Sequence, residues 1–206
     1  MALLKLARMG HPVLRQPARS IPAGQMDNPA LQRLIDDMAL TMVEDEGIGL
    51  AAPQVFQSVR LVVLGTSETA DTGGTTNSHT VLINPVWLER TGDMVEDWEG
   101  CLSLPGLRGL VPRHNLVRLQ ALDRSGHSVQ LEAEGYMARV LQHEIDHLDG
   151  ILYVDRMPDL RHLAFLDEFR RYWSGTPAGA DQRQKTGCSS PESVTGGQDN
   201  AQTNSS

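Results

Sequence analysis

Apolar residues recur at helical spacing in three parts of the chain. The first part follows Asn28 and Pro29, a pair that favours the start of a helix, and runs to the acidic residues 44–46. The second ends at Gly150, a natural helix terminator, and the third begins at Asp159, which can cap a helix. The spacing therefore predicts three helices. Their apolar positions are Leu31, Leu34, Ile35, Met38, Met42 and Val43, then Met137, Leu141, Ile145 and Leu148, and finally Leu160, Leu163, Phe165, Leu166, Phe169 and Trp173.

Four other segments have the pattern of β-strands. Residues 60–64 and 81–90 are rich in β-branched and aliphatic side chains, and Pro85 in the second favours a sheet edge or a bulge. A Thr/Gly/Ser-rich loop over residues 66–79 separates them. Residues 116–122 and 129–133 alternate apolar and polar positions around a turn at 123–126, which predicts an antiparallel hairpin.

Residues 47–54 (GIGLAAPQ) interrupt the first helical pattern. Their small side chains allow the backbone to approach a ligand or another segment closely, but they fit a tight connection from a helix to a strand equally well. These residues alone do not decide between the two interpretations.

Composition limits the number of domains. A chain of 206 residues with 40% hydrophobic content can bury one substantial core. From residue 174 onward Gly, Ser, Thr, Gln and Pro dominate and apolar residues almost disappear. We therefore expect a single domain over residues 1–173 and a disordered polar tail over residues 174–206.

Charge and cysteine content exclude several classes of protein. A formal charge of -8 argues against broad binding to DNA, which needs clustered Lys and Arg. The two cysteines, Cys101 and Cys188, are too few for a disulfide framework, and the second lies in the polar tail. No apolar run is long enough to span a membrane or to form a secretory signal. We expect a cytoplasmic protein without a membrane partner.

The second helical pattern contains the motif HExxH. His143 and His147 lie about one turn apart on the same face of such a helix, so both imidazoles can bind one metal ion. Glu144 is placed to take a proton from a water molecule that the metal activates. Two partly buried core histidines would give the same pattern, so the motif needs a third ligand.

Three positions compete for that ligand. The longer motif HExxHxxGxxH would place a histidine at position 153, which is Tyr153, so this option fails. Glu168 in the third helical pattern could serve, as in some zinc peptidases. Cys101 lies beside Gly100 and offers a thiolate, a strong ligand for zinc or ferrous iron, although a lone cysteine is often only a small buried side chain.

Three motifs together resemble those of the peptide deformylase family. They are GIGLAAPQ at residues 47–54, EGCLS at residues 99–103 and QHEIDH at residues 142–147, in the order and spacing of that family. The resemblance extends from about residue 4 to residue 173. It implies an α+β fold in which antiparallel strands pack around a central HExxH helix, with N-terminal and C-terminal helices. It also implies a metal-dependent hydrolase that removes the formyl group from the N-terminal formyl-methionine of nascent proteins and releases formate.

The resemblance further implies a role for each motif residue. Cys101, His143 and His147 match the family's metal ligands, for one divalent ion that is expected to be Fe2+, with Zn2+ or Ni2+ as substitutes. Glu144 matches the general base. Gln54 and the backbone N–H of Leu102 match the donors to the developing oxyanion.

The resemblance also indicates which residues meet the substrate. Gly49 matches a glycine whose backbone contacts the peptide, and its neighbours Ile48 and Leu50 are expected to share that role. Residues 135–139 (GYMAR) resemble the corresponding residues of mitochondrial-type deformylases. In the family this helical turn forms part of the wall of the methionine pocket. Tyr136, Arg139 and Val140 are therefore expected to shape that pocket, although an ion pair is an equal alternative for Arg139. Because residues 1–8 lack a transit peptide, we expect a bacterial cytoplasmic enzyme.

Several charged residues outside the motifs have two interpretations. Arg108 and Arg113 could contact the peptide or pair with acidic groups. Glu99 and Asp146 could orient a metal ligand or an arginine, and an exposed Asp146 would argue against that role. A final set could dock the ribosome near its exit tunnel or simply form a solvated face: Arg161, Arg170 and Arg171.

Overall fold

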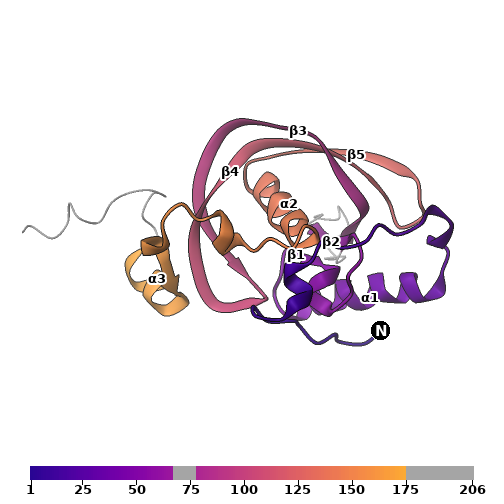
Figure 1. Cartoon of the computed structure of the whole chain (residues 1–206), viewed down its shortest axis with the longest axis horizontal. Coiled ribbons are helices and arrows are strands. Elements are labelled where there is room, and N and C mark those ends of the chain that lie inside the picture. The colour runs from indigo at the N-terminus through magenta and orange to yellow at the C-terminus, as the bar shows by residue number, and fades with distance from the viewer. Residues whose placement is uncertain (67–77, 175–206) are drawn as a thin grey trace, which may run out of the picture.

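The structure, a computed structural model, describes residues 1–66 and 78–174 (Figure 1). Within these residues, three α-helices accompany one antiparallel sheet of six strands, which confirms the α+β class. The helices are Pro29–Glu44 (α1), Gly135–Leu148 (α2) and Leu166–Tyr172 (α3). The strands are Gly49–Ala51 (β1), Leu61–Thr66 (β2), Ser78–Cys101 (β3), Leu104–Leu122 (β4), Ser128–Glu134 (β5) and Leu163–Phe165 (β6).

The sheet follows the order β1-β2-β3-β4-β5, and β6 pairs with β4. Strands β3, β4 and β5 curve over α2 in Figure 1. The predicted hairpin is confirmed, since β4 and β5 pair from Leu116 opposite Glu134 to Leu122 opposite Ser128. Strand β3 ends where Cys101 pairs with Leu104 of β4, so the chain reverses direction at the cysteine.

The short strand β2 is buried on both faces. Val62 and Leu64 pack in the core between the sheet and α2, whereas Leu61 and Val63 pack in the core beneath α1. Alternate residues of a strand point to opposite faces, so a strand between two helices needs an unbroken apolar run. This explains the continuous sequence LVVL at residues 61–64.

Helix α1 begins as predicted. Asn28 accepts a hydrogen bond from the backbone N–H of Ala30 at 2.9 Å, and Pro29 occupies the first turn, where its missing N–H leaves no bond unmade. Its buried apolar side chains face the sheet, while Val43 at the far end stays exposed. Four of the predicted apolar positions are buried: Leu31, Ile35, Met38 and Met42.

Strand β3 is much longer than the sequence predicted. The expected segment 81–90 is its first part only, and the strand continues through register shifts to Cys101. One shift lies between Ile83 and Val86, as expected for Pro85. There Asn84 adopts a φ of 51°, and its side chain exchanges two hydrogen bonds with the backbone of Ile21. Bulges of this kind let a long strand bend around α2.

The predicted C-terminal helix begins later than its apolar spacing indicated. Asp159 caps only a 3-10 turn, Leu160–His162, by accepting a hydrogen bond from the N–H of Arg161. Strand β6 then pairs with residues 107–109 of β4, and α3 starts at Leu166. Pairing with the sheet satisfies the backbone there, which local spacing could not reveal.

The expected polar tail, apart from Ser174, and nearly all of the expected loop at 66–79 lie outside the described residues. Across 1–66 and 78–174, the structure contains no helix with the length and apolar character needed to cross a membrane.

Candidate metal centre

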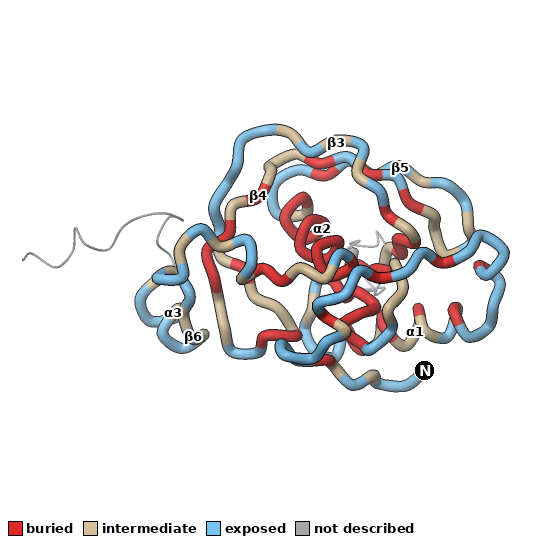
Figure 2. The backbone as a smooth tube through the Cα atoms, viewed as in Figure 1, coloured by how far each residue is buried: buried red, intermediate tan, exposed pale blue. Residues whose placement is uncertain are grey.

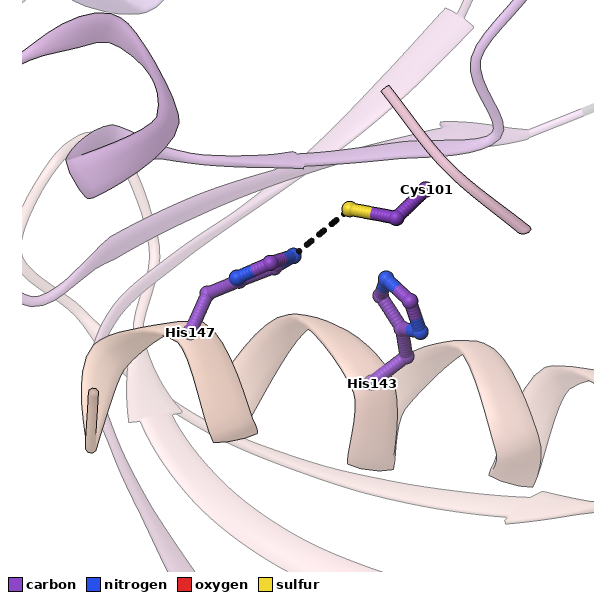
Figure 3. A group of neighbouring side chains, drawn as sticks. All are labelled: Cys101, His143 and His147. Atoms are coloured by element: carbon purple, nitrogen blue, oxygen red, sulfur yellow. Dashed lines mark hydrogen bonds between the residues drawn. The ribbon is translucent and has the colours of Figure 1, made fainter. Parts of the chain in front are cut away.

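Helix α2 presents two imidazoles to the end of β3. The rings of His143 and His147 lie 5.0 Å apart between centroids, as expected for positions one helical turn apart. Figure 3 shows the sulfur of Cys101 lying above both rings, and it is 3.2 Å from Nε2 of His147. One ligand atom from each of the three residues lies within 4.8 Å of the other two. Among the described residues, this is the group with the geometry to hold a metal ion.

Local structure explains the position of the cysteine. The turn between β3 and β4 brings the backbone N–H of Ser103 to 3.4 Å from Sγ of Cys101. The side-chain amide of Gln54 donates to the same sulfur at 3.5 Å and to Oγ of Ser103 at 3.4 Å. The sulfur is therefore held from two sides. Ser103 is a contact of the site that motif reasoning did not assign.

The other two positions considered for the third ligand, 153 and 168, do not supply one. Glu168 is on the exposed helix α3, where its carboxylate lies 3.7 Å from Arg171. Tyr153 is buried and its ring stacks on that of His143, with centroids 6.1 Å apart and planes inclined by 22°. Tyr153 thus packs on the ring of a candidate ligand, at the position where some metal sites carry a third histidine.

The donor set fits a divalent cation. One thiolate and two imidazoles suit zinc or ferrous iron, whereas magnesium and calcium require oxygen ligands. Burial by itself would raise the pKa of the Cys101 thiol, but the charge on His147 and a hydrogen bond with His143 outweigh it and lower the pKa well below its usual value. The site therefore favours an anionic sulfur, the form that binds metal.

Glu99 holds the first histidine. Its Oε2 lies 2.8 Å from Nδ1 of His143, which leaves Nε2 of that ring available as a ligand atom. Glu99 also receives two hydrogen bonds from Arg113, at 2.9 and 3.0 Å, and one from Arg139 at 2.8 Å. Burial opposes ionisation of Glu99, but the bonds from His143 and Arg113 prevail and hold its pKa well below the usual range.

A second carboxylate, that of Asp146 on α2, completes this network. Asp146 is buried and accepts a hydrogen bond from Arg113 at 2.5 Å and another from Arg156 at 2.8 Å. Glu99 therefore orients a candidate ligand directly, and Asp146 acts on it through Arg113. Pairing with acidic groups is the role that the structure gives Arg113, and Arg156 is a member that the motifs did not reveal.

Glu144 lies beside the candidate ligands without belonging to that group. It is buried, and its Oε2 has no hydrogen-bond partner among the described residues. Burial raises its pKa, although the charges on His143 and His147 oppose the shift. A carboxylate with a raised pKa is suited to accept a proton near neutral pH.

Two glycines lie directly against side chains that a Cβ atom would displace. A Cβ on Gly49 would lie 2.6 Å from Cγ of Glu144, so any side chain there would displace the carboxylate. A Cβ on Gly100 would lie 2.0 Å from a guanidinium nitrogen of Arg108, which donates to the carbonyl of Leu107. The sequence assigned Gly49 to the substrate, and the structure gives it this additional role.

Gln54 points its amide toward Cys101 of the candidate ligand group. It is buried, its Oε1 accepts a hydrogen bond from the N–H of Ala51 at 2.8 Å, and its Nε2 faces Cys101 and Ser103. Fixing the oxygen in this way decides which end of the amide faces the site. Leu102 follows Cys101 in the same turn, and its carbonyl accepts a hydrogen bond from Arg8.

The residues expected to contact substrate have different surroundings. Ile48 and Tyr136 are exposed, at 42% and 59% of their accessible surface. Leu50 is fully buried in the core beneath α1, and Val140 packs in the core between α2 and the sheet. The side chain of Arg139 is buried and bonded to Glu99 and to the carbonyls of residues 95 and 111, so the ion pair is the role that the structure shows.

Comparison with known proteins agrees with the motifs. The sequence pattern of the family described as polypeptide deformylase matches residues 3–162. Peptide deformylase 1 of Nitrosomonas europaea is 47% identical over 161 residues, covering 78% of this chain and 90% of that protein. Peptide deformylase 2 of Bordetella bronchiseptica is 44% identical over 164 residues, covering 79% and 92%.

Solved structures show the same relationship. A Met-Ala-Ser-bound class I type b peptide deformylase from Acinetobacter baumannii has a TM-score of 0.68 and 36% identity, and the match covers 75% of this chain and 98% of that one. A peptide deformylase from Synechococcus elongatus in complex with actinonin has a TM-score of 0.69 and 37% identity, covering 82% and 85%.

Proposed function

The chain belongs to the peptide deformylase family, and on this premise we propose which of its residues carry the reaction. Like the family, the protein removes the N-formyl group from the N-terminal formyl-methionine of nascent proteins and releases formate. The activity depends on a metal, and we assign its ligands to Cys101, His143 and His147. The observation that carries this assignment is the clustering of one sulfur and two imidazoles within 4.8 Å. The HExxH helix α2 would then be the element on which the site is built.

A formamide needs two kinds of assistance, because delocalisation of its nitrogen lone pair makes it a poor electrophile. When bound, a divalent ion acts as a Lewis acid that activates a water molecule near neutral pH. Glu144 accepts the proton that the water loses and later passes it to the amine that leaves. Its burial and raised pKa support this role.

The second kind of assistance is stabilisation of negative charge on the formyl oxygen. We assign it to Nε2 of Gln54 and the backbone N–H of Leu102, which adjoin Cys101 in sequence or in space. Because the Ala51 N–H fixes the amide of Gln54, the donor is already oriented before substrate binds. Loss of one such donor typically costs about 100- to 1,000-fold in rate.

We propose Fe2+ as the resident ion, with Zn2+ or Ni2+ as substitutes. An anionic sulfur leaves the metal less electron-poor than three neutral imidazoles would, which weakens its Lewis acidity and makes the identity of the metal matter. Glu99, itself fixed by Arg113 and Arg139, would keep His143 in the orientation that binding requires.

The proposed substrate pocket includes Ile48, Gly49, Leu50, Tyr136 and Val140, with Arg139 acting through its ion pair. The partners are N-formylmethionyl peptides of nascent chains, and the Acinetobacter relative was solved with Met-Ala-Ser bound. We place the catalytic domain at residues 1–173, which encloses the matched residues 3–162. An enzyme that acts on nascent chains works in the cytoplasm, close to the ribosome. We propose no role for DNA or membranes.

Metal content tests the ligand assignment. The variant Cys101→Ala would be prepared with ferrous iron under low oxygen. We expect it to contain less than stoichiometric metal and to have no activity on formyl-Met-Ala-Ser. Glu168→Ala should keep both, because that side chain lies on α3 away from the imidazoles. Metal retained by Cys101→Ala and lost by Glu168→Ala would contradict the assignment.

A further inference from the structure

A cavity lies behind the ion-pair network, between the β3–β4 ribbon, α2 and the 3-10 turn Tyr153–Arg156. Its volume is about 200 Å³, large enough for a small ion or the end group of a larger ligand. None of the proposed metal ligands lines it. The polar, charged and aromatic side chains on which the inference rests are Trp87, Arg90, Arg113, His114, Asp146 and Arg156.

Positive charge exceeds negative charge in this lining. Three arginines face one carboxylate, Asp146, in a chain whose formal net charge is -8. Asp146 is shared by Arg113 and Arg156, and Arg113 is paired with Glu99 as well. Arg90 has no ion-pair partner in the described part of the chain, and its guanidinium lies 5.6 Å from the centroid of the Trp87 ring. Arg90 therefore contributes the uncompensated charge.

His114 also lines the cavity. Its backbone N–H and carbonyl are bonded to the side-chain amide of Gln142, at 3.1 and 2.8 Å, which fixes the residue beside α2.

We propose that this cavity binds a phosphate group. Guanidinium groups recognise phosphate through paired, charge-assisted hydrogen bonds, and its several acceptor oxygens can serve Arg90 and Arg156 together. A carboxylate, with two oxygens in one plane, offers fewer directions. Because Arg113 and Arg156 are already committed to Asp146, binding depends most on Arg90.

The site adjoins the support of the metal centre without overlapping it. Arg156 and Arg113 hold Asp146, Arg113 holds Glu99, and Glu99 holds His143. A bound phosphate group would therefore stabilise the outer end of this chain of contacts. Binding does not require the deformylase assignment, so the two can fail separately.

The indole N–H signals provide a local measurement. The full-length protein loaded with zinc would be titrated with inorganic phosphate at constant ionic strength and followed by two-dimensional ¹H–¹⁵N NMR. We expect the indole signal of Trp87 to shift saturably. Those of Trp98 and Trp173, which contact each other near α3, should stay constant and serve as internal controls against an effect at the metal.

Two variants of matched charge sharpen the result. Arg90→Gln should raise the dissociation constant for phosphate roughly tenfold, which is the loss of affinity expected for one charge-assisted contact. Arg118→Gln removes an arginine that is paired with Glu89 and Glu132 outside the cavity, and it should leave the constant unchanged.

Two further titrations identify the ligand class. Glycerol 3-phosphate should shift the same signal if the cavity accepts a phosphate monoester, and it should fail if only the free ion fits; either result agrees with a phosphate site. Formate at the same concentration should not compete. The proposal is overturned if phosphate gives no saturable shift of Trp87, if Arg90→Gln binds as tightly as the unmodified protein, or if formate binds more tightly than phosphate.

Discussion

Helices α2 and α3 arise from similar apolar spacing but occupy opposite environments. Every residue of α2 from position 138 to 148 is buried, whereas no residue of α3 is (Figure 2). The sheet curves over α2, while α3 lies to one side of it, in contact with the ribbon through Trp98 (Figure 1). Amphipathic spacing therefore predicts that a helix forms, but the surrounding strands decide what its polar residues can do.

The charged residues of the two helices show the difference. Asp146 on α2 is buried and meets two arginines, with hydrogen bonds of 2.5 and 2.8 Å. On α3, Arg170 and Arg171 lie 3.9 and 3.7 Å from carboxylates in the same helix, and all four side chains are largely in solvent. Pairs of the first kind are costly to break, and pairs of the second kind contribute little.

The largest expected effect is on catalysis, at Glu144. Glu144→Gln keeps the shape of the side chain but cannot accept a proton, so kcat for formyl-Met-Ala-Ser should fall by about 100- to 10,000-fold while bound metal stays stoichiometric. Steady-state kinetics with metal analysis would test this. The matched change on α3, Glu168→Gln, should leave kcat unaltered. An active Glu144→Gln enzyme would remove the distinction between the two helices.

The next effect is on stability, at Arg113. Arg113→Met leaves Glu99 and Asp146 short of a buried partner, so the free energy of unfolding should fall by about 3–5 kcal/mol in denaturant titrations. Arg118 lies on the same strand but is half exposed, and Arg118→Met should change the free energy of unfolding much less than Arg113→Met does. Equal losses in the two variants would show that burial does not set the value of these pairs.

The charges on α3 should matter much less for folding. The double change Arg170→Gln and Arg171→Gln breaks two solvent-exposed pairs, so we expect the free energy of unfolding to change by no more than about 0.5 kcal/mol. The same denaturant titration checks it. A loss comparable with that of Arg113→Met would mean that α3 is as firmly integrated as α2.

The smallest effect concerns pH, at the turn before α3. Hydrogen bonds from the side chain and backbone N–H of Arg161 lower the pKa of Asp159 to about 2. Because this folded value lies below the usual one near 3.8, the contribution to stability is complete above about pH 4 and is lost as the pH falls through 2. Carbon-detected NMR titration would measure the pKa, and a value near 4 would show that the cap is not formed in solution.

Much of the fold could be predicted from local pattern. Helix α1, the hairpin of β4 and β5, and the irregularity at Pro85 all follow from residues that are close together in sequence. The C-terminal region could not be predicted in the same way. Its apolar spacing is helical, but pairing of β6 with residues 107–109 replaces part of the expected helix, and that partner is more than fifty positions away.

In the candidate site, too, local features could be predicted from the sequence and long-range contacts could not. Its chemical groups could be identified from three short motifs, because HExxH fixes the spacing of two imidazoles and a helix preserves that spacing. Residues that support the site lay beyond the motifs. The contacts of Arg156 with Asp146, and of Tyr153 with His143, depend on how the segment after α2 folds back.

The sequence by itself determined the family, the helical spacing of His143 and His147, and the presence of a carboxylate, Glu144, beside them. Only the tertiary structure decided that Cys101 joins the two imidazoles while Glu168 stays in solvent, and that Arg139 is held in an ion pair. The physical reason is that spacing along one helix is set by local geometry, whereas the approach of a thiolate or a guanidinium depends on how distant strands bend and pair.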